Sequence, residues 1–211
     1  MNPNNRLKGL SSIALSDIIG SGATAFFWFF LASLITPEEY GEIFFYLGIA
    51  TIISSIVLLA NQSTVTVFIA KKIKLQTTLY TVTLIATFVA SLILIFWFYR
   101  TDIIIVLVGF VFNTLALGEL LGRKLFNSYS KFVLLQKGLV VLLGLGFYYI
   151  FGIDGILYAI GLSYVGYTVL VYRGMKIKKL DFPLFKQHAG FISNNHSYGI
   201  IGILSNQIDK I

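Results

Sequence analysis

The sequence predicts an all-α membrane protein, built as a polytopic bundle of six transmembrane helices plus the start of a seventh. Three observations support this fold class. Hydrophobic residues make up 57% of the 211 residues and charged residues only 12%, whereas soluble domains carry about 25% charged residues. Apolar segments long enough to cross a bilayer recur along the chain. The basic residues collect in alternate connections between these segments, as expected of a chain that crosses a membrane repeatedly.

The predicted spans follow from helix geometry. A helix rises about 1.5 Å per residue, so about 20 apolar residues cross a hydrocarbon core of about 30 Å. By this rule, residues 1–180 form a six-helix bundle, and residues 181–211 form a cytoplasmic linker and the start of a seventh helix near Gly190. The six spans are Leu10–Ile35, Tyr40–Ala60, Thr77–Tyr99, Ile103–Gly122, Phe132–Phe151 and Ile153–Tyr172.

The charged residues predict the orientation of the bundle. If the N-terminus is cytoplasmic, fourteen of the sixteen Lys and Arg residues fall on the cytoplasmic side. They are Arg6, Lys8, Lys71, Lys72, Lys74, Arg123, Lys124, Lys131, Lys137, Arg173, Lys176, Lys178, Lys179 and Lys186. The other side receives Arg100 as its one basic residue, with Glu38, Glu39, Glu42, Asp102 and Asp154. Basic residues in short loops favour the cytoplasm, so we expect a multi-pass protein of the plasma (cytoplasmic) membrane.

The net charge of +7 is largely explained by this topology, and no nucleic-acid partner is expected. Membrane lipids are the expected partners. Lys176, Lys178 and Lys179 either anchor the chain at the interface or bind anionic headgroups.

Polar residues gather on one face of the first span. Ser16, Asp17, Gly20, Ser21 and Thr24 follow the i, i+3, i+4 spacing of a helix face. Lipid offers such residues no partner, so this face should look into the bundle. Asp17, Ser21 and Thr24 are therefore candidates for binding substrate or a coupling ion. The alternative for Asp17 is a structural hydrogen bond to a neighbouring helix.

Three further polar residues are candidates for the same role. Asn61 and Gln62 mark the end of the second span, and the apolar stretch Val65–Ala70 predicts a helix that continues beyond a polar kink. Asn113 lies deeper, in the fourth span, where it either lines a cavity or forms a hydrogen bond across helices.

Two other patterns predict structural contacts. Glu119 and Arg123 stand four residues apart at the cytoplasmic end of the fourth span, a spacing that favours an ion pair along the helix. Gly155, Ala159 and Ser163 recur every four residues in the sixth span, which lets another helix approach closely.

The sequence contains no pattern of catalytic residues. It has no cysteine, and its two histidines, His188 and His196, have no acidic cluster nearby that would complete a metal site. Neither a GxxxxGK[ST] phosphate loop nor a G-x-S-x-G elbow occurs. We therefore expect no enzymatic activity, no cofactor and no metal.

A charged pair lies close to the end of the chain. Asp209 and Lys210 fall within the last apolar segment, just before Ile211. A charge inside hydrocarbon costs about 2.5–3.5 kcal/mol, so the pair needs a partner, a bundle interior or water. We therefore expect the chain to be the front half of a longer membrane protein. Gln207, Asp209 and Lys210 are candidates for substrate or ion binding.

Short motifs are spread over the whole chain. Lys8-Gly9-Leu10 leads into a first span with internal polar residues, and Pro37-Glu38-Glu39-Tyr40-Gly41-Glu42 enters the second. Arg123-Lys124-Leu125-Phe126 joins the fourth and fifth spans, and Gly152-Ile153-Asp154-Gly155-Ile156 leads into the sixth. In Phe191–Ile211, the motif residues are Gly202, Leu204, Gln207, Ile208, Asp209 and Lys210. Together these motifs resemble the polysaccharide-transporter flippases of the multidrug, oligosaccharidyl-lipid and polysaccharide exporter superfamily, whose seventh helix carries a Q-x-D-K run.

The resemblance implies two similar six-helix halves around a central cavity, of which this chain is the first half plus the start of the second. It also implies a substrate, a polyprenyl-linked oligosaccharide or polysaccharide precursor, which is exported by alternating access as one bundle rocks against the other. Glycan-assembly enzymes are further expected partners. The family's cavity usually carries cationic residues that meet pyrophosphate. In this sequence Lys210, beside Asp209, is the one basic residue expected in a span interior.

Two alternatives remain open from the sequence. A cation-coupled drug or metabolite antiporter of the same superfamily would show ion-dependent efflux. A non-transporting membrane scaffold for glycan-assembly enzymes would need no polar cavity, and it would tolerate neutral replacement of Asp17 and Asn113.

Overall fold

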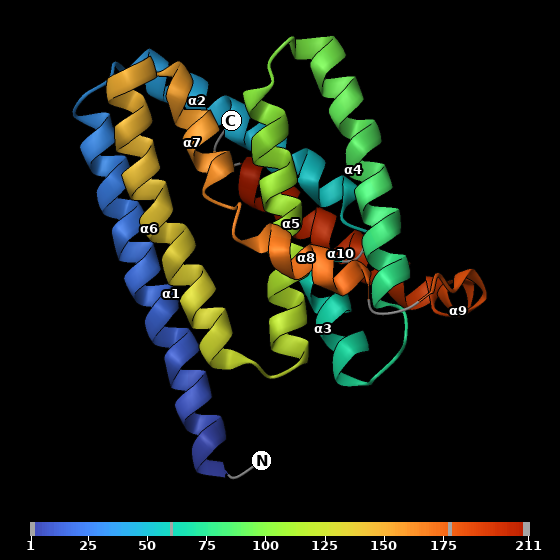
Figure 1. Ribbon diagram of the computed structural model, residues 1–211. Coiled ribbons are helices and arrows are strands. Elements are labelled where there is room, and N and C mark those ends of the chain that lie inside the picture. The colour runs from blue at the N-terminus through green and yellow to red at the C-terminus, as the bar shows by residue number, and fades with distance from the viewer. Residues whose placement is uncertain (1–2, 60, 177–178, 209–211) are drawn as a thin grey trace.

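A computed structural model describes residues 3–59, 61–176 and 179–208 of the protein, and this part of the chain contains helices and no strands (Figure 1). The helices are α1 (Pro3–Ala32), α2 (Pro37–Val57), α3 (Gln62–Ala70), α4 (Gln76–Phe98), α5 (Asp102–Gly122), α6 (Phe126–Phe151), α7 (Asp154–Leu162), α8 (Tyr167–Met175), α9 (Phe182–Gln187) and α10 (Ala189–Ile208). The all-α membrane fold class is thereby confirmed in its coarse form.

Within the described residues, five helical segments are long and apolar enough to cross a membrane. They are Lys8–Ala32, Pro37–Ala70, Gln76–Phe98, Asp102–Gly122 and Phe126–Phe151. A sixth span results only if α7 and α8, which are bent by 48° at their junction, are counted as one. Helix α10 begins where the seventh span was expected, but it is not among these segments.

Helix α5 forms the centre of the bundle and contacts α2, α3, α4, α7 and α8 (Figure 1). Its residues Val106, Leu107, Val111 and Leu115 are fully buried. Helices α1 and α6 pack against each other along one side. Large apolar side chains such as Phe96 and Trp97 of α4 point outward, as expected of a bundle whose solvent is lipid.

The second span is interrupted where the sequence predicts a polar kink. Helix α2 begins with a capping box, in which the Thr36 hydroxyl accepts from the Glu39 N–H and the Thr36 N–H donates to the Glu39 carboxylate. It ends at Val57, and α3 begins at Gln62. Asn61 caps α3, because its Oδ1 accepts from the Thr64 N–H at 2.9 Å.

Two of the predicted spans differ from the helices of the structure. Helix α6 starts at Phe126 and not at Phe132, because its first turns pack on α1: the Phe126 ring lies over Gly9, and the Ser130 hydroxyl lies 2.9 Å from that of Ser12. The sixth span is not continuous, since the chain turns between Leu162 and Tyr167.

The sixth span packs closely on its neighbours before it turns. Gly161 lies so near α5 that an added Cβ would come within 2.8 Å of the Val106 nitrogen. The predicted small residues Gly155, Ala159 and Ser163 are all buried. An added Cβ at Gly155 would come within 2.6 Å of the Phe147 carbonyl oxygen of α6. These residues therefore hold α7 tightly between α5 and α6.

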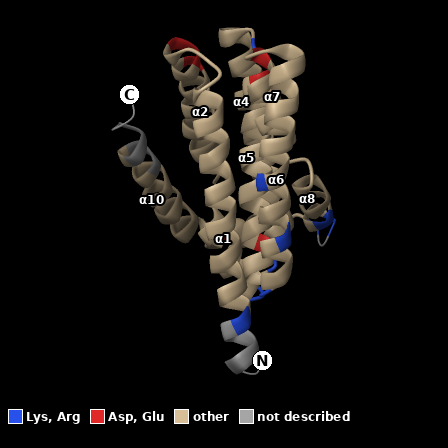
Figure 2. Ribbon diagram, turned by 90° about the vertical axis from the view of Figure 1, so that its left-hand side faces the viewer, with Lys and Arg blue, Asp and Glu red and all other residues tan. Residues whose placement is uncertain are grey.

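Charged residues gather at the two ends of the bundle (Figure 2). The acidic end, defined by the α1–α2, α4–α5 and α6–α7 connections, carries Glu38, Glu39, Glu42, Asp102 and Asp154, with Arg100. The basic end, defined by the α3–α4 and α5–α6 connections, carries Lys71, Lys72, Lys74, Arg123 and Lys124. The charge separation predicted from the sequence therefore corresponds to two opposite ends of one bundle.

Candidate functional site

A cavity of about 230 Å³ lies between α1, α2, α5, α6 and α7, and we call it the central cavity. It is lined by Thr24, Trp28, Phe44, Leu47, Gly48, Thr51, Phe110, Gln136, Lys137, Val140, Ile160 and Tyr164. Most of these residues are apolar or aromatic. A few polar groups converge among them, which is the usual composition of a small-molecule site.

Lys137 is the charged residue of the central cavity. It stands eleven residues after Phe126, about 17 Å along the axis of α6, and so lies near the middle of that helix. From the sequence it was counted with the cytoplasmic residues, because the predicted span began at Phe132, whereas α6 begins six residues earlier, at Phe126. Lys137 thus lies near the middle of a helix that is long and apolar enough to cross a membrane.

Asp17 of α1 lies close enough to α6 for its negative charge to act on Lys137 and on the Tyr129 hydroxyl. Its side chain is exposed, and it forms none of the ion pairs found among the described residues. The Lys137 side chain crosses α1 at Gly20, one turn beyond Asp17. An opposite charge across two packed helices is the usual way of reducing the cost of a charge inside a membrane. Asp17 therefore stays a candidate site residue, beside the central cavity but not among the residues that line it.

The polar face of α1 points only partly into the bundle. Ser16 and Gly20 are buried against α6 and Thr24 lines the central cavity, but Asp17 and Ser21 are exposed. At 100° per residue the predicted face spans about 140° of the helix surface, and Asp17 and Ser21 fall at the side of it farthest from Ser16. The expectation that Asp17 and Ser21 face inward was therefore wrong, because the contact with α6 covers less than the whole arc.

Gln136 ties the central cavity to the break between α7 and α8. It is buried, and its Nε2 donates to the Ser163 hydroxyl at 3.1 Å. Ser163 in turn donates to the Ile160 carbonyl oxygen at 2.6 Å. Neither Gln136 nor Lys137 was a predicted site residue. Their signal in the sequence is an adjacent polar pair with apolar residues on both sides, Leu134-Leu135 before it and Leu139-Val140 after Gly138.

The remaining predicted site residues lie elsewhere. Asn61 and Gln62 lie at the α2–α3 break, where the Asn61 amide donates to the Asn195 carbonyl oxygen of α10 at 2.8 Å. Asn113 of α5 is half-buried and does not line the central cavity. Gln207 belongs to the last turn of α10, but its side chain is outside the described residues, as are Asp209 and Lys210. The central cavity thus unites Thr24 with Lys137 and Gln136, and not with these residues.

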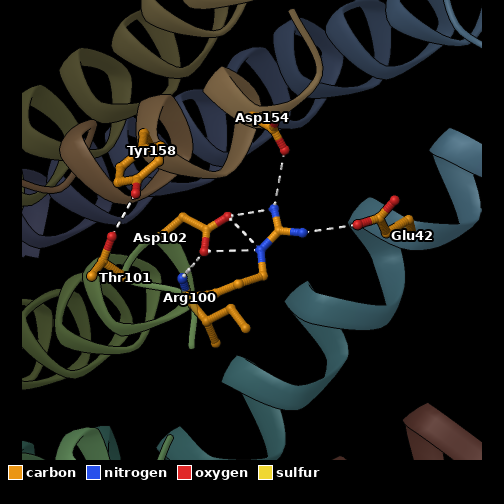
Figure 3. A network of polar contacts seen from close by, with 7 residues as sticks. Glu42, Arg100, Thr101, Asp102, Asp154 and Tyr158 are labelled. Atoms are coloured by element: carbon orange, nitrogen blue, oxygen red, sulfur yellow. Dashed lines mark hydrogen bonds and ion pairs between the residues drawn. The ribbon is translucent and has the colours of Figure 1, made fainter. Parts of the chain in front are cut away.

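A second polar cluster closes the acidic end of the bundle (Figure 3). The Arg100 guanidinium donates to Asp102 of α5 and to Glu42 of α2, each at 2.8 Å, and contacts Asp154 of α7 at 3.5 Å. It also lies 4.4 Å from the centre of the Tyr46 ring. The hydrogen bonds to Asp102 are the main reason that the pKa of Arg100 is raised above its ordinary value. Arg100 therefore connects three helices at this end.

Glu119 organises a third cluster, near the basic end. Its carboxylate is buried and accepts from the Arg123 Nε at 2.7 Å, which confirms the predicted ion pair. It also accepts from the Gln76 amide at 2.7 Å and lies 3.2 Å from the Tyr80 hydroxyl. These contacts satisfy the buried carboxylate and join α4 to α5, so the cluster is structural.

The histidines do not form a metal site. Among the residues that the structure describes, no group of three His, Cys, Asp or Glu side chains is placed to hold a metal ion. His188 packs against the Phe68 ring. His196 has its Nδ1 3.2 Å from the Leu58 carbonyl oxygen, which can only accept, so Nδ1 carries the proton. His196 of α10 and His188, in the turn just before α10, thus both contact the broken second span.

Comparison with known proteins gives no further assignment. No family model, no curated protein and no solved structure matches the chain. Assignment of a function therefore rests on the geometry of the central cavity.

Proposed function

We propose that this chain is the first bundle of a flippase-like transporter, which exports a polyprenyl-linked oligosaccharide or polysaccharide precursor by alternating access. The observation that supports this proposal most is Lys137, a basic side chain near the middle of α6 that lines the central cavity. Ionisable residues inside a membrane bundle are costly and generally mark a substrate or ion pathway.

The chemistry of the substrate suits this cavity. A polyprenyl-linked glycan carries a pyrophosphate between lipid and sugar, and the Lys137 ammonium group is a point charge of the kind that binds phosphate. A volume of about 230 Å³ accommodates such a group but not a sugar chain. In this proposal the sugars occupy the space between this bundle and a second one. The negative charge of Asp17 acts on Lys137 and in this proposal offsets part of its positive charge while no substrate is present.

The distribution of charge supports an orientation with the N-terminus in the cytoplasm. The basic end holds Lys71, Lys72, Lys74, Arg123 and Lys124, and such loops are retained on the cytoplasmic side. In this orientation the Arg100 cluster lies at the outer surface. Opening of the acidic end during transport then requires the contacts of Arg100 with Glu42 or Asp154 to separate.

One observation favours the antiporter alternative. Four aromatic residues, Trp28, Phe44, Phe110 and Tyr164, line the central cavity, and aromatic faces attract organic cations. A neighbouring lysine repels the same cations. The presence of Lys137 in the cavity therefore makes an anionic substrate the better choice.

The proposal can be tested with an intrinsic fluorophore. The chain has two tryptophans: Trp28 lines the central cavity and Trp97 is 77% exposed on α4. A Trp97→Phe variant in phosphatidylcholine nanodiscs leaves Trp28 as the single reporter. We expect undecaprenyl pyrophosphate to change its emission, and Lys137→Gln to weaken the apparent affinity by about tenfold, the equivalent of about 1.4 kcal/mol.

Lys131→Gln is the matched control, since Lys131 is an exposed lysine of the same helix and does not line the cavity. It should bind undecaprenyl pyrophosphate as the parent does. Equal affinity of Lys137→Gln and the parent would contradict the proposal. A response to tetraphenylphosphonium and none to pyrophosphate would favour the antiporter, and no response to either would favour the scaffold.

A further inference from the structure

A second cavity of about 230 Å³ lies at the basic end of the bundle, where the α3–α4 connection faces the end of α5. Its charged residues are Lys72 and Lys74 from that connection and Arg123 from the end of α5. Gln76 and Thr77, both buried, lie at its α4 side. We call it the basic cavity. It shares no lining residue with the central cavity.

The basic cavity carries an excess of positive charge. Among the described residues, neither Lys72 nor Lys74 forms an ion pair. Arg123 is paired with Glu119 through its Nε and donates through Nη2 to the Gln76 Oε1 at 3.3 Å. Three positive charges thus face one carboxylate, and that carboxylate already accepts from Arg123 and Gln76. An anion in the cavity would meet two lysines whose charges are not balanced.

The backbone adds to this field. Helix α4 begins at Gln76 without any side-chain cap. The first turn of a helix presents N–H groups and the positive end of the helix dipole. This end of a 23-residue helix therefore adds to the positive charge of Lys72, Lys74 and Arg123 on the same cavity.

We propose that the basic cavity binds a phosphate group, supplied by the headgroup of an anionic phospholipid. Basic pockets between helices at the membrane surface suit such headgroups. The cavity lies where α3 and α5 end and α4 begins. Ile69 and Ile73 line it beside the lysines, so that apolar and cationic surfaces adjoin and match the apolar chains and anionic headgroup of a phospholipid. Topology alone requires basic residues on this side of the membrane, but it does not require two separate connections to converge on one cavity. This inference does not depend on the proposed transport activity.

The backbone of Lys72 allows a sharp test. Lys72 has φ of +58°, in the left-handed region that favours glycine. Lys72→Gly therefore removes a charge from the cavity while relieving the backbone. Lys124 offers the matched control, because it has φ of +59° in the equivalent turn after α5 and does not line the basic cavity. Both variants lose one lysine and gain the same backbone freedom.

The experiment is native mass spectrometry of the purified chain, released from detergent micelles after titration with dioleoylphosphatidylglycerol or dioleoylphosphatidylcholine. We expect preferential retention of phosphatidylglycerol. Each of Lys72→Gly and Lys74→Gln should weaken this retention by about fivefold, the equivalent of about 1 kcal/mol. Lys124→Gly should retain the lipid as the parent does. Circular dichroism of every variant verifies that the helical content is kept.

Two results would overturn the proposed site. One is equal retention of the two lipids by the parent, and the other is an equal loss in Lys124→Gly, which would show that any lysine of the basic end contributes. A parallel titration with inorganic phosphate distinguishes the source of the phosphate. Displacement of phosphatidylglycerol by phosphate adducts that depend on Lys72 would overturn the lipid assignment.

Discussion

Lys137 of α6 lies against Gly20 of α1 so closely that a methyl group at position 20 would come within 3.0 Å of the lysine Cγ. The missing side chain of Gly20 thus leaves the space through which the Lys137 side chain passes. It also determines the path by which the Lys137 side chain crosses α1 between Asp17 and the central cavity.

Gly20→Ala should therefore displace the Lys137 side chain and weaken the binding of undecaprenyl pyrophosphate, as measured by Trp28 fluorescence. The helix itself should gain about 0.5–1 kcal/mol from replacement of a mid-helix glycine, so loss of binding would not reflect unfolding. Gly22→Ala is the control on the same helix, because an added Cβ there meets no atom within 4 Å. Identical binding by the two variants would show that the position of Lys137 does not matter.

The sequence predicted best those elements whose ends coincide with changes in hydropathy. The predicted span Thr77–Tyr99 differs from α4 by one residue at each end. The predicted span Ile103–Gly122 differs from α5 by one residue at its start and ends at the same residue. The polar kink before α3 was also predicted, because an uncompensated Asn61-Gln62 pair inside a span requires a local partner.

The sequence failed where tertiary packing decides. The early start of α6 accompanies the contact of Phe126 with Gly9, and the sixth span packs on α5 at Gly161 just before its bend. Neither contact leaves a periodic signal in one sequence. Because α6 was predicted to start too late, Lys137 was not recognised as a candidate site residue. A lysine five residues into a span can reach the membrane interface, whereas one eleven residues after the start of a helix lies deeper.

Arg100→Gln should destabilise the bundle at its acidic end. The substitution leaves the Asp102 carboxylate, only 3% exposed, without its guanidinium partner, and hydrogen bonds to charged groups contribute about 1.5–3 kcal/mol. Asp154→Asn is the control, since Asp154 is 77% exposed and its contact with Arg100, at 3.5 Å, is longer than the contact of Arg100 with Asp102. Such exposed ion pairs contribute little to stability. Thermal unfolding in detergent, followed by circular dichroism, should show a clearly lower melting temperature for Arg100→Gln and an unchanged one for Asp154→Asn. Equal loss in both variants would mean that the exposed ion pair matters as much as the buried one.

The contribution of Arg100 should not vary with pH in ordinary buffers. Its pKa, already far above the range of ordinary buffers, is raised further in the folded state, chiefly by the hydrogen bonds to Asp102. A group with a raised folded pKa stabilises the protein fully below its unfolded pKa and loses this effect only as the pH rises through the folded value. The difference in unfolding free energy between parent and Arg100→Gln should therefore be equal at pH 6 and pH 9. If the difference in unfolding free energy decreased between pH 6 and pH 9, another titrating group would have to be responsible.

Cysteine labelling should reveal the orientation of the bundle without background, because the chain contains no cysteine. Ser33 lies at the acidic end and Asn127 at the basic end, and both are exposed. In intact cells a membrane-impermeant maleimide should label Ser33→Cys, and it should label Asn127→Cys only after permeabilisation. The reverse pattern would invert the proposed topology. Labelling of both variants in intact cells would contradict the assignment of the basic and acidic ends to opposite faces of a membrane.

Helix α10 is held on the broken second span by polar contacts that can be separated. Asn61 accepts from the Thr64 N–H as the cap of α3 and donates to the Asn195 carbonyl oxygen of α10. Asn61→Asp keeps the capping oxygen and loses the donor, whereas Asn61→Ala loses both. The two contacts contribute about 1 kcal/mol each.

Ile192 of α10 is only 4% exposed, so Ile192→Cys reports undocking of the helix through its rate of maleimide labelling. Because labelling requires the opened state, Asn61→Asp should raise the rate by about fivefold and Asn61→Ala by up to about thirtyfold, in line with losses of about 1 and 2 kcal/mol. Equal rates for the two variants would mean that the cap of α3 does not contribute to the docking of α10 and that the donor to Asn195 does. Rates unchanged from the parent would assign the docking to the contacts of His188 with Phe68 and of His196 with Leu58. In that case His196→Ala, which removes the donor to the Leu58 carbonyl oxygen, should release the helix.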